Sequence, residues 1–334
     1  MSMRSPLRYE GYEHGSREGR LVSDRDRDFL QPRVLVPFIL VTLIWGSAWL
    51  AIKGQLTSVP PAWSVTYRLA IGATAMFAYA AATRAKLRIG REGHLLAMAF
   101  GIPQFFLNFN LVYLAERYVT SGLVAVVFAL LLVPNSLLAL IFLKHRISRR
   151  FVLGSLVAVT GVALLFVQEL RASRPDAEQV PLGIGLTFLA LICVSIANVA
   201  QAGERLRAQS LLGLTVWGMV YGLAANALLA SALYGAPTFD TGLVYVGGLL
   251  YLGLIGSAYA FTVYFALIRT IGPARAAFSG LLVPIIAMAL STIVEGYRWT
   301  PIAMVGGVLT LAGLFIALNA RGSDTAATAV IPAD

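Results

Sequence analysis

The chain has few charged residues and almost no cysteine. Asp, Glu, Lys and Arg make up 13% of its 334 residues, whereas they form about a quarter of an ordinary soluble domain. Hydrophobic residues make up 58%, and the mean hydropathy is +0.77. Cys193 is the single cysteine and lies in an apolar run, which excludes a disulfide framework within the chain and a thiolate metal site. The composition predicts a protein that crosses a membrane several times.

Acidic side chains are absent from the middle of every apolar run. The sixteen acids and the three histidines lie in the terminal segments, in loops or at the ends of runs. An enzyme acting inside the membrane needs a base, a metal or an activated nucleophile within reach. We therefore expect no catalytic residue, no metal site and no cofactor. A buried acid of the kind that drives many proton antiporters is not predicted either.

The chain consists largely of long apolar runs. Ten segments have about the 20 residues that a helix needs to cross a bilayer, and the connections between them are too short for a soluble domain. They are 34–56, 61–82, 94–115, 120–143, 151–168, 181–202, 211–233, 243–268, 274–295 and 300–320. The predicted fold is an all-α integral membrane protein of ten transmembrane helices. Residues 1–33 are predicted to be a disordered cytoplasmic tail, and residues 321–334 a cytoplasmic C-terminal tail.

The basic residues predict the orientation. The net charge of +10 is carried in short loops and not beside aromatic side chains on a soluble face, so we expect a lipid bilayer as partner and no nucleic acid. The links after even-numbered segments, together with Arg275 at the start of the ninth segment, carry twelve Lys and Arg residues, and those after odd-numbered segments carry four. Because loops rich in Lys and Arg stay cytoplasmic, both termini are predicted to be cytoplasmic.

The chain repeats itself at a spacing of about 150 residues. Phe128 to Pro134 reads FALLLVP and Phe278 to Pro284 reads FSGLLVP. Other marks keep the same spacing: Tyr113 with Tyr264, Gly154 with Gly306, and Gly161 with Gly313. The two copies lie five crossings apart, so residues 34–168 and 181–320 are predicted to be two inverted five-helix repeats. That arrangement is typical of secondary transporters whose central site is exposed to either side in turn.

Two stretches carry a resemblance to a known family. Trp45 to Gly72 contains Trp-Gly-Ser, a Lys, a Pro-Pro turn and an Arg, and Tyr251 to Gly296 contains a Pro and a closing Glu. Together they resemble the EamA-type members of the drug/metabolite transporter superfamily. The resemblance implies ten helices in two inverted repeats, a prokaryotic inner (plasma) membrane location, and export or exchange of amino acids or related small metabolites. Where the family pattern has an acid at the end of helix 4, this chain has Lys144 and His145.

Two charges lie inside predicted spans. Arg68 is seven residues into the second segment, about 10 Å deep at 1.5 Å per residue. It could attract a substrate carboxylate, or it could bond carbonyl or phosphate oxygens and anchor the helix. Lys53 is nearer the interface and is interpreted as an anchor.

Uncharged polar residues supply further candidates for a substrate site. Gln104 and Asn108 are four residues apart and share a helix face, while Phe106, Asn110 and Tyr113 are expected to point the other way. We place Gln104 and Asn108 in the cavity. Asn135 either binds substrate or satisfies the backbone next to Pro134, and Trp45 either lines the cavity or packs. The predicted substrate-binding residues are Trp45, Arg68, Gln104, Asn108, Asn135, Asn198, Tyr259 and Tyr264.

The functional hypothesis is facilitated export or exchange of a neutral or zwitterionic solute. A proton dependence set by Glu116 or Glu295 would contradict it. Import of a nucleoside, vitamin or other metabolite, and a membrane scaffold that transports nothing, stay open as alternatives. A GxxxG pair, Gly218 and Gly222, fits close packing of helices or the face of a homodimer.

Overall fold

The computed structural model describes residues 31–56, 59–85, 87–144, 147–171, 177–271, 276 and 278–328. Most of the N-terminal segment expected as a tail lies outside these residues. The helices of the first half are α2 (Pro32–Lys53), α3 (Pro61–Ala82), α4 (Gly90–Gly101), η1 (Ile102–Leu107), α5 (Asn108–Ala115), α6 (Ser121–Ala129), α7 (Leu132–Leu143) and α8 (Arg149–Arg171). A short turn of helix, η2 (Ala177–Gln179), leads into the second half.

The second half repeats the same order of helices. They are α9 (Val180–Ala202), α10 (Glu204–Arg207), α11 (Leu211–Tyr234), α12 (Leu243–Leu250), η3 (Tyr251–Tyr259), α13 (Ala260–Ile271), α15 (Ser279–Val294) and α16 (Pro301–Thr328). α16 continues past residue 320 into the segment that was expected to be a tail.

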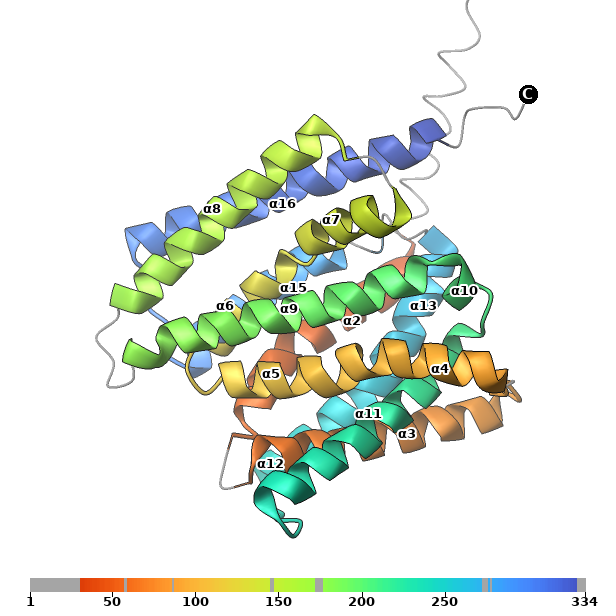
Figure 1. Cartoon of the computed structure of the whole chain (residues 1–334). Helices are drawn as coiled ribbons and strands as arrows, with labels where there is room; N and C mark the ends of the chain where they lie inside the picture. Colours follow the sequence, from red (N-terminus) through yellow and green to blue (C-terminus); the bar gives the residue numbers. More distant parts are fainter. Residues whose placement is uncertain are drawn as a thin grey trace, which may run out of the picture.

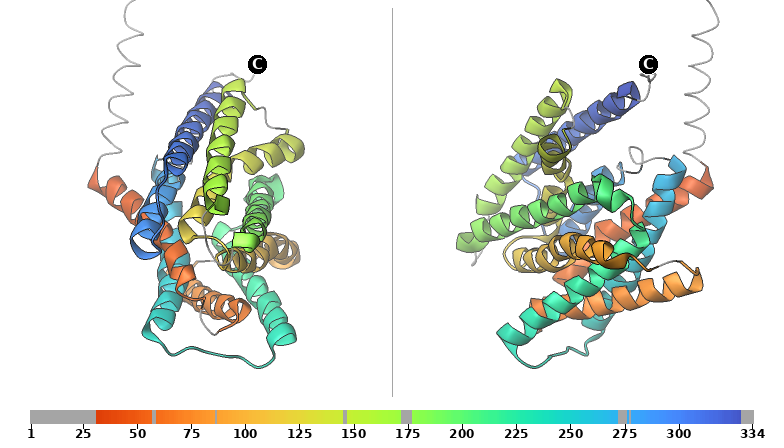
Figure 2. Two further views of the ribbon diagram at one scale, coloured as in Figure 1. Left: turned by 90° about the vertical axis from the view of Figure 1, so that its left-hand side faces the viewer. Right: turned by 45° about the vertical axis from the view of Figure 1, so that its right-hand side comes forward.

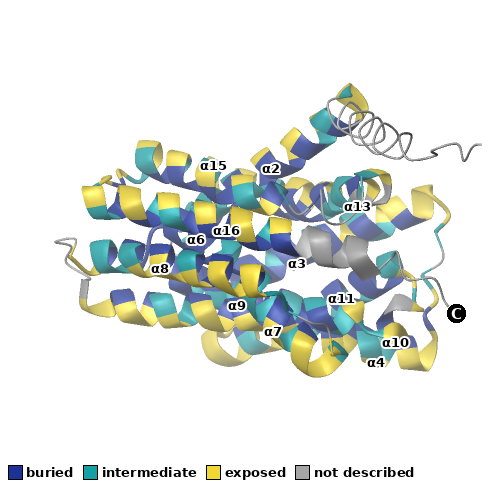
Figure 3. Ribbon diagram, turned by 90° about the horizontal axis from the view of Figure 1, so that it is seen from above, coloured by how far each residue is buried: buried dark blue, intermediate teal, exposed yellow. Residues whose placement is uncertain are grey.

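The lengths and apolar character of these helices confirm an all-helical membrane protein. Among the described residues, eight helical stretches are long and apolar enough to span a bilayer, and α15 is a shorter apolar helix. Lipid offers backbone groups no hydrogen-bond partners, which is why the apolar runs form helices. Figure 3 shows exposed residues along the outward faces of helices such as α8 and α16. Large apolar side chains such as Phe142, Leu153 and Ile293 are more than half exposed, as a lipid-facing surface requires.

The third helix of each repeat is widened by a π-helical segment. η1 lies between α4 and α5, and η3 lies between α12 and α13. π-helical turns of this kind are uncommon and gather at functional sites. Their presence at matching places in both halves follows the internal repeat.

The fourth helix of the first repeat is broken into two, and α15 of the second repeat corresponds to the latter part of it. α6 ends at Ala129 and α7 begins at Leu132, while α15 runs through Pro284. Pro134 has no N–H to donate to the carbonyl of Leu130, and that carbonyl accepts from the N–H of Val133 instead, at 2.8 Å. The break between α6 and α7 thus lies one turn before Pro134.

The closest helix pair shows the inverted symmetry directly. α8 and α16 lie side by side along one edge of the bundle (Figures 1 and 2). A Cβ added at Gly154 would lie 2.7 Å from the carbonyl oxygen of Gly313, and one at Gly161 would lie 2.5 Å from that of Gly306. Gly154 corresponds to Gly306 and Gly161 to Gly313, so each contact is the image of the other, as a twofold relation requires.

Candidate functional site

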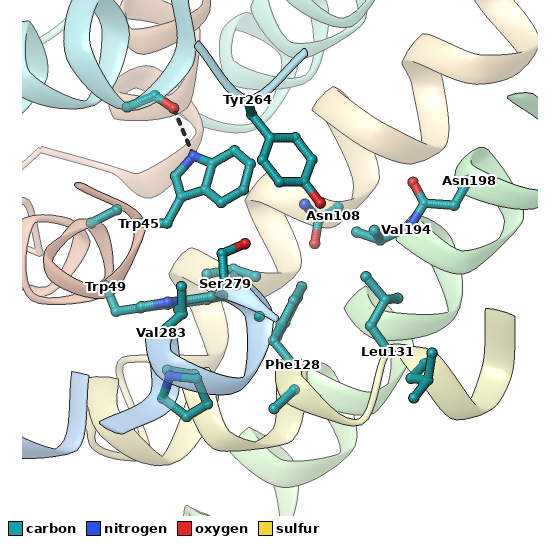
Figure 4. Close-up of a pocket in the computed structure, with 18 of the residues that line it drawn as sticks. Trp45, Trp49, Asn108, Phe128, Leu131, Val194, Asn198, Tyr264, Ser279 and Val283 are labelled. Atoms are coloured by element: carbon teal, nitrogen blue, oxygen red, sulfur yellow. Dashed lines mark hydrogen bonds between the residues drawn. The ribbon is translucent and has the colours of Figure 1, made fainter. Parts of the chain in front are cut away.

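A cavity of about 490 Å³ lies between the two repeats, within the range of small-molecule sites. The first repeat contributes α2, α3, η1, α5, α6 and α7 to its walls. The second repeat contributes α9, η3, α13, α15 and α16. Figure 4 shows side chains from these helices pointing into a common space. Both repeats therefore contribute to one site.

Aromatic side chains form much of the wall. The Trp45 and Tyr264 ring centroids are 4.8 Å apart, and those of Trp49 and Phe128 are 4.9 Å apart. The indole N–H of Trp45 donates to the carbonyl oxygen of Gly256 at 3.3 Å (Figure 4). Because Gly256 belongs to η3, the π-helical segment of one repeat holds a tryptophan of the other. These rings offer flat apolar surfaces to a ligand.

Several polar atoms of the lining are buried without a hydrogen-bond partner among the described residues. Three are amide oxygens, on Gln104, Asn108 and Asn135, and one is the indole N–H of Trp49. Asn108 donates its own amide to the carbonyl oxygen of Gln104 at 3.3 Å, which leaves its oxygen free. A buried acceptor without a donor costs about 1–3 kcal/mol. A ligand that supplies N–H groups would recover this cost.

Arg68 is the one charged residue among the described residues that line the cavity. Its side chain is 7% exposed, and the central guanidinium carbon lies 4.1 Å from the centre of the Phe109 ring. Its Nε has no hydrogen-bond partner within the described parts of the chain. A buried guanidinium with a free donor is suited to bind a carboxylate.

The cavity brings together seven of the eight predicted site residues. Trp45, Arg68, Gln104, Asn108, Asn135, Asn198 and Tyr264 all line it. Tyr259 is 46% exposed and is not part of the lining. Asn110 was expected to point away from the face of Gln104 and Asn108. It does so, and its side chain donates to Asn226 on α11.

The expected direction of Tyr113 was wrong. Tyr113 lines the same cavity as Gln104, although nine residues of a regular α-helix would turn it to the opposite side. The π-helical turns of η1 lie between the two residues and change the register. Sequence periodicity gave no signal for this change.

Of the two interpretations of Gly218 and Gly222, the structure supports close packing of helices. Both glycines pack within the chain: a Cβ at Gly218 would lie 3.1 Å from Phe100, and one at Gly222 would lie 2.8 Å from Phe105. This face of α11 is covered by α4 and η1, so it does not provide the surface of a homodimer.

One end of the cavity is closed by a hydrogen-bonded layer. We call it the Lys53 end, since α2 and α5 end there and α3 and α6 begin there. The Tyr113 hydroxyl donates to Gln55 at 2.6 Å, and Gln55 donates to the carbonyl oxygen of Tyr245 at 3.4 Å. The hydroxyls of Tyr245 and Ser64 are 2.9 Å apart. This layer joins the first repeat to α12 of the second.

A second contact closes the Lys53 end beside this layer. The Glu295 carboxylate at the end of α15 accepts from the backbone N–H of Ser121 at 3.2 Å and from its hydroxyl. Ser121 is the first residue of α6, so the carboxylate caps a helix of the other repeat. Lys53 donates to the carbonyl oxygens of Glu116 and Val119, in agreement with its interpretation as an anchor.

The opposite end of the cavity is less closed. Side chains lining the Lys53 side, such as Asn108, Val112 and Tyr113, are buried. Those lining the other side, such as Asn135 and Asn198, are partly exposed, and Gly280 is exposed. Figure 4 shows Asn198 and Tyr264 at this side of the cavity, with the Tyr264 hydroxyl directed toward Asn108.

Taken together, an inverted duplication, helices of membrane length and a cavity between the repeats that holds a few polar groups define a multi-pass membrane transporter. The sequence matches the EamA-like transporter family over residues 33–167 and 181–319. The chain belongs to this family.

Known relatives cover nearly the whole chain. Protein PagO of Salmonella typhimurium is 26% identical, over 86% of this chain and 93% of its own. A probable terminal-alkyne amino-acid exporter of Streptantibioticus cattleyicolor is 27% identical, over 85% and 92%. A probable amino-acid metabolite efflux pump of Salmonella typhimurium is 23% identical, over 83% and 92%. A solved crystal structure shares the fold, with a TM-score of 0.61 at 19% identity, over 87% of this chain and 98% of its own.

Proposed function

We propose that this transporter exports or exchanges small metabolites, most of all amino acids or related compounds, by alternating access of the cavity between its repeats. The observation that carries the proposal is a cavity whose described lining holds one cation, Arg68, together with amide oxygens that have no partner among the described residues. Arg68 suits a carboxylate, and the amide oxygens suit an ammonium group. Relatives named as amino-acid exporters and efflux pumps support the same substrate class.

The aromatic lining supports a substrate with an apolar side chain. Trp45, Trp49, Phe128 and Tyr264 surround the cavity, and burying an apolar side chain against such rings favours binding by about 25 cal/mol per Å² of surface. A zwitterionic head at Arg68 and the amides would leave the side chain among these rings.

We further propose that the protein lies in the prokaryotic plasma membrane with both termini in the cytoplasm, so that the Lys53 end faces outward. Bacterial relatives and the excess of basic residues in alternate loops support this orientation. The closed Lys53 end and the exposed residues at the opposite end then correspond to an inward-facing state.

Counterflow in proteoliposomes tests the proposal. Vesicles holding one unlabelled amino acid or metabolite are diluted into a trace of the labelled compound, with and without a pH gradient. We expect transient accumulation for amino acids. Gln104→Leu and Asn108→Leu should abolish it, and Tyr259→Phe, which changes a residue outside the cavity, should not.

The same measurement separates the alternatives. Accumulation of nucleosides or vitamins and not of amino acids would favour an importer of those compounds. Folded protein that gives no accumulation with any compound, and whose cavity variants behave as wild type, would favour the scaffold and overturn the proposal.

A further inference from the structure

Glu116 is buried more completely than its place in the sequence suggests. It follows the last residue of α5, yet its side chain is 0% exposed. Neither carboxylate oxygen has a hydrogen-bond partner within the described residues. An ionised carboxylate in such a place would carry a large desolvation cost, which a carboxyl group avoids by taking up a proton.

The charged groups around Glu116 come from three other helices. Lys53 at the end of α2 attracts a negative charge on Glu116. Its ammonium group, however, donates to the backbone carbonyls of Glu116 and Val119. Arg68 on α3 also attracts a negative charge here, while Glu295 at the end of α15 repels it. Tyr113, one turn back on α5, donates to Gln55 and is not bonded to the carboxyl.

The balance of these effects favours the protonated form. Burial raises the pKa of Glu116 well above its ordinary value, and Glu295 adds to the rise. Lys53 and Arg68 lower it without cancelling the effect of burial. The carboxyl is thus a group whose affinity for a proton depends on whether the Lys53 end is closed.

We propose that Glu116 is a proton-binding site of the outer gate, which is occupied while the Lys53 end is closed and releases its proton when that end opens to water. The proposal rests on the proposed function, in which the Lys53 end faces outward and opens during alternating access. It replaces the expectation of proton-independent exchange with a pH-dependent step.

The sign of the effect follows from linkage. The closed form holds the proton more tightly, so acid outside stabilises the closed form, and opening becomes easier as the outer pH rises. Between the ordinary pKa and the raised one, the ratio of open to closed form should change by at most about tenfold per pH unit for one proton. Below and above that window the ratio should level off.

Cysteine labelling from outside tests this directly. Ala48 lines the cavity from α2, so a cysteine there is reached by an impermeant thiol reagent added outside when the Lys53 end opens. The experiment uses Cys193→Ser/Ala48→Cys protein in right-side-out vesicles between about pH 5 and pH 8. Thr238→Cys, in the exposed connection between α11 and α12, corrects for the pH dependence of the reagent itself.

We expect corrected labelling of Ala48→Cys to rise severalfold with pH. Adding Glu116→Gln, which mimics the protonated form, should keep labelling low at every pH. Adding Glu116→Asp, which keeps a titratable group, should retain the rise. Labelling that does not change with pH, or that changes equally in the Glu116→Gln protein, would overturn the proposal.

Counterflow in the same vesicles separates the two proposals. Counterflow without pH-dependent labelling would remove the role of Glu116 and leave the transporter proposal standing. A pH-dependent gate in protein that gives no counterflow with any compound would support Glu116 as a proton site and count against the proposed substrate class.

Discussion

The two ends of the bundle occupy equivalent places in the repeats but carry different residues. Glu116 lies three residues after Tyr113, and its counterpart three residues after Tyr264 is Leu267. Glu116 lies near Lys53 and Glu295, whereas Leu267 is buried in an apolar cluster with Val34 and Phe38. Glu295, which caps α6, corresponds in the sequence to His145 at the 150-residue spacing of Pro134 and Pro284.

This difference explains why the closed end is the Lys53 end. Two identical repeats in inverted orientation would give inward-facing and outward-facing states of equal energy. Closure of the Lys53 end depends on specific hydrogen bonds, while Leu267, at the place equivalent to Glu116, offers only apolar contact. A few substitutions at equivalent positions are therefore enough to favour one state without a change of fold.

The largest effect on stability should come from the contact between α8 and α16, where the two repeats remain equivalent. A Cβ at Gly161 would lie 2.4 Å from the backbone nitrogen of Thr310, and one at Gly313 would lie 2.3 Å from that of Ala158. Gly161→Val and Gly313→Val should each cost about 3 kcal/mol, because neither backbone can move aside. Thermal unfolding in detergent measures the loss.

The matched control is Gly280→Ala, since a Cβ there meets nothing within 4 Å. It should unfold near the wild-type temperature. Unequal losses at Gly161 and Gly313 would show that the symmetry of this seam does not extend to its energetics.

The second effect concerns a charge that only one repeat carries. Arg68 lies on α3, and the corresponding helix α11 has no charged residue. Arg68→Met should weaken binding of a carboxylate substrate by about 10- to 100-fold, the loss of one hydrogen bond to a charged group. Competition of substrate and its methyl ester in counterflow tests this: wild type should prefer the free acid, and the variant should not. Equal preference in both proteins would assign Arg68 to helix anchoring.

The sequence predicted the framework of this fold because that framework depends on long apolar runs and on the internal repeat. Both can be read directly from the order of the residues. It also predicted most of the cavity lining, since polar residues such as Gln104 and Asn198 stand out inside apolar helices. Tyr259 stands out in the same way but is 46% exposed, since it lies within η3, whose π-helical turns depart from the regular helical register.

Burial of Glu116 could not be predicted for a different reason. Its position at the end of a segment indicates an interfacial carboxyl, and only the approach of α15 from the other repeat covers it. Gln55, at the end of the predicted segment 34–56, was missed in the same way, since it is 0% exposed only because α12 and α5 close over it. Contacts between repeats leave no periodic signal in either one.

The third effect should appear at the contact between Glu295 and Ser121, which joins the two repeats. Glu295→Gln keeps the shape of the side chain but removes the charge that caps α6 at Ser121. We expect the ratio of open to closed Lys53 end to rise by up to about tenfold, because loss of a hydrogen bond to a charged group costs about 1.5 kcal/mol. Labelling of Ala48→Cys from outside should increase accordingly. Lys144→Gln, one residue before the equivalent place in the first repeat, is the control and should leave outside labelling unchanged.

The smallest effect should come from the hydrogen-bonded layer beneath the cavity. Tyr113→Phe removes the hydroxyl that donates to Gln55 at 2.6 Å but keeps the ring that lines the cavity. Loss of one neutral hydrogen bond contributes about 1 kcal/mol, so outside labelling should increase by about fivefold. Tyr264→Phe changes the equivalent tyrosine of the other repeat and should not increase it. If both variants open the Lys53 end equally, the layer around Gln55 does not close it, and the difference between the two ends lies in the carboxyl groups alone.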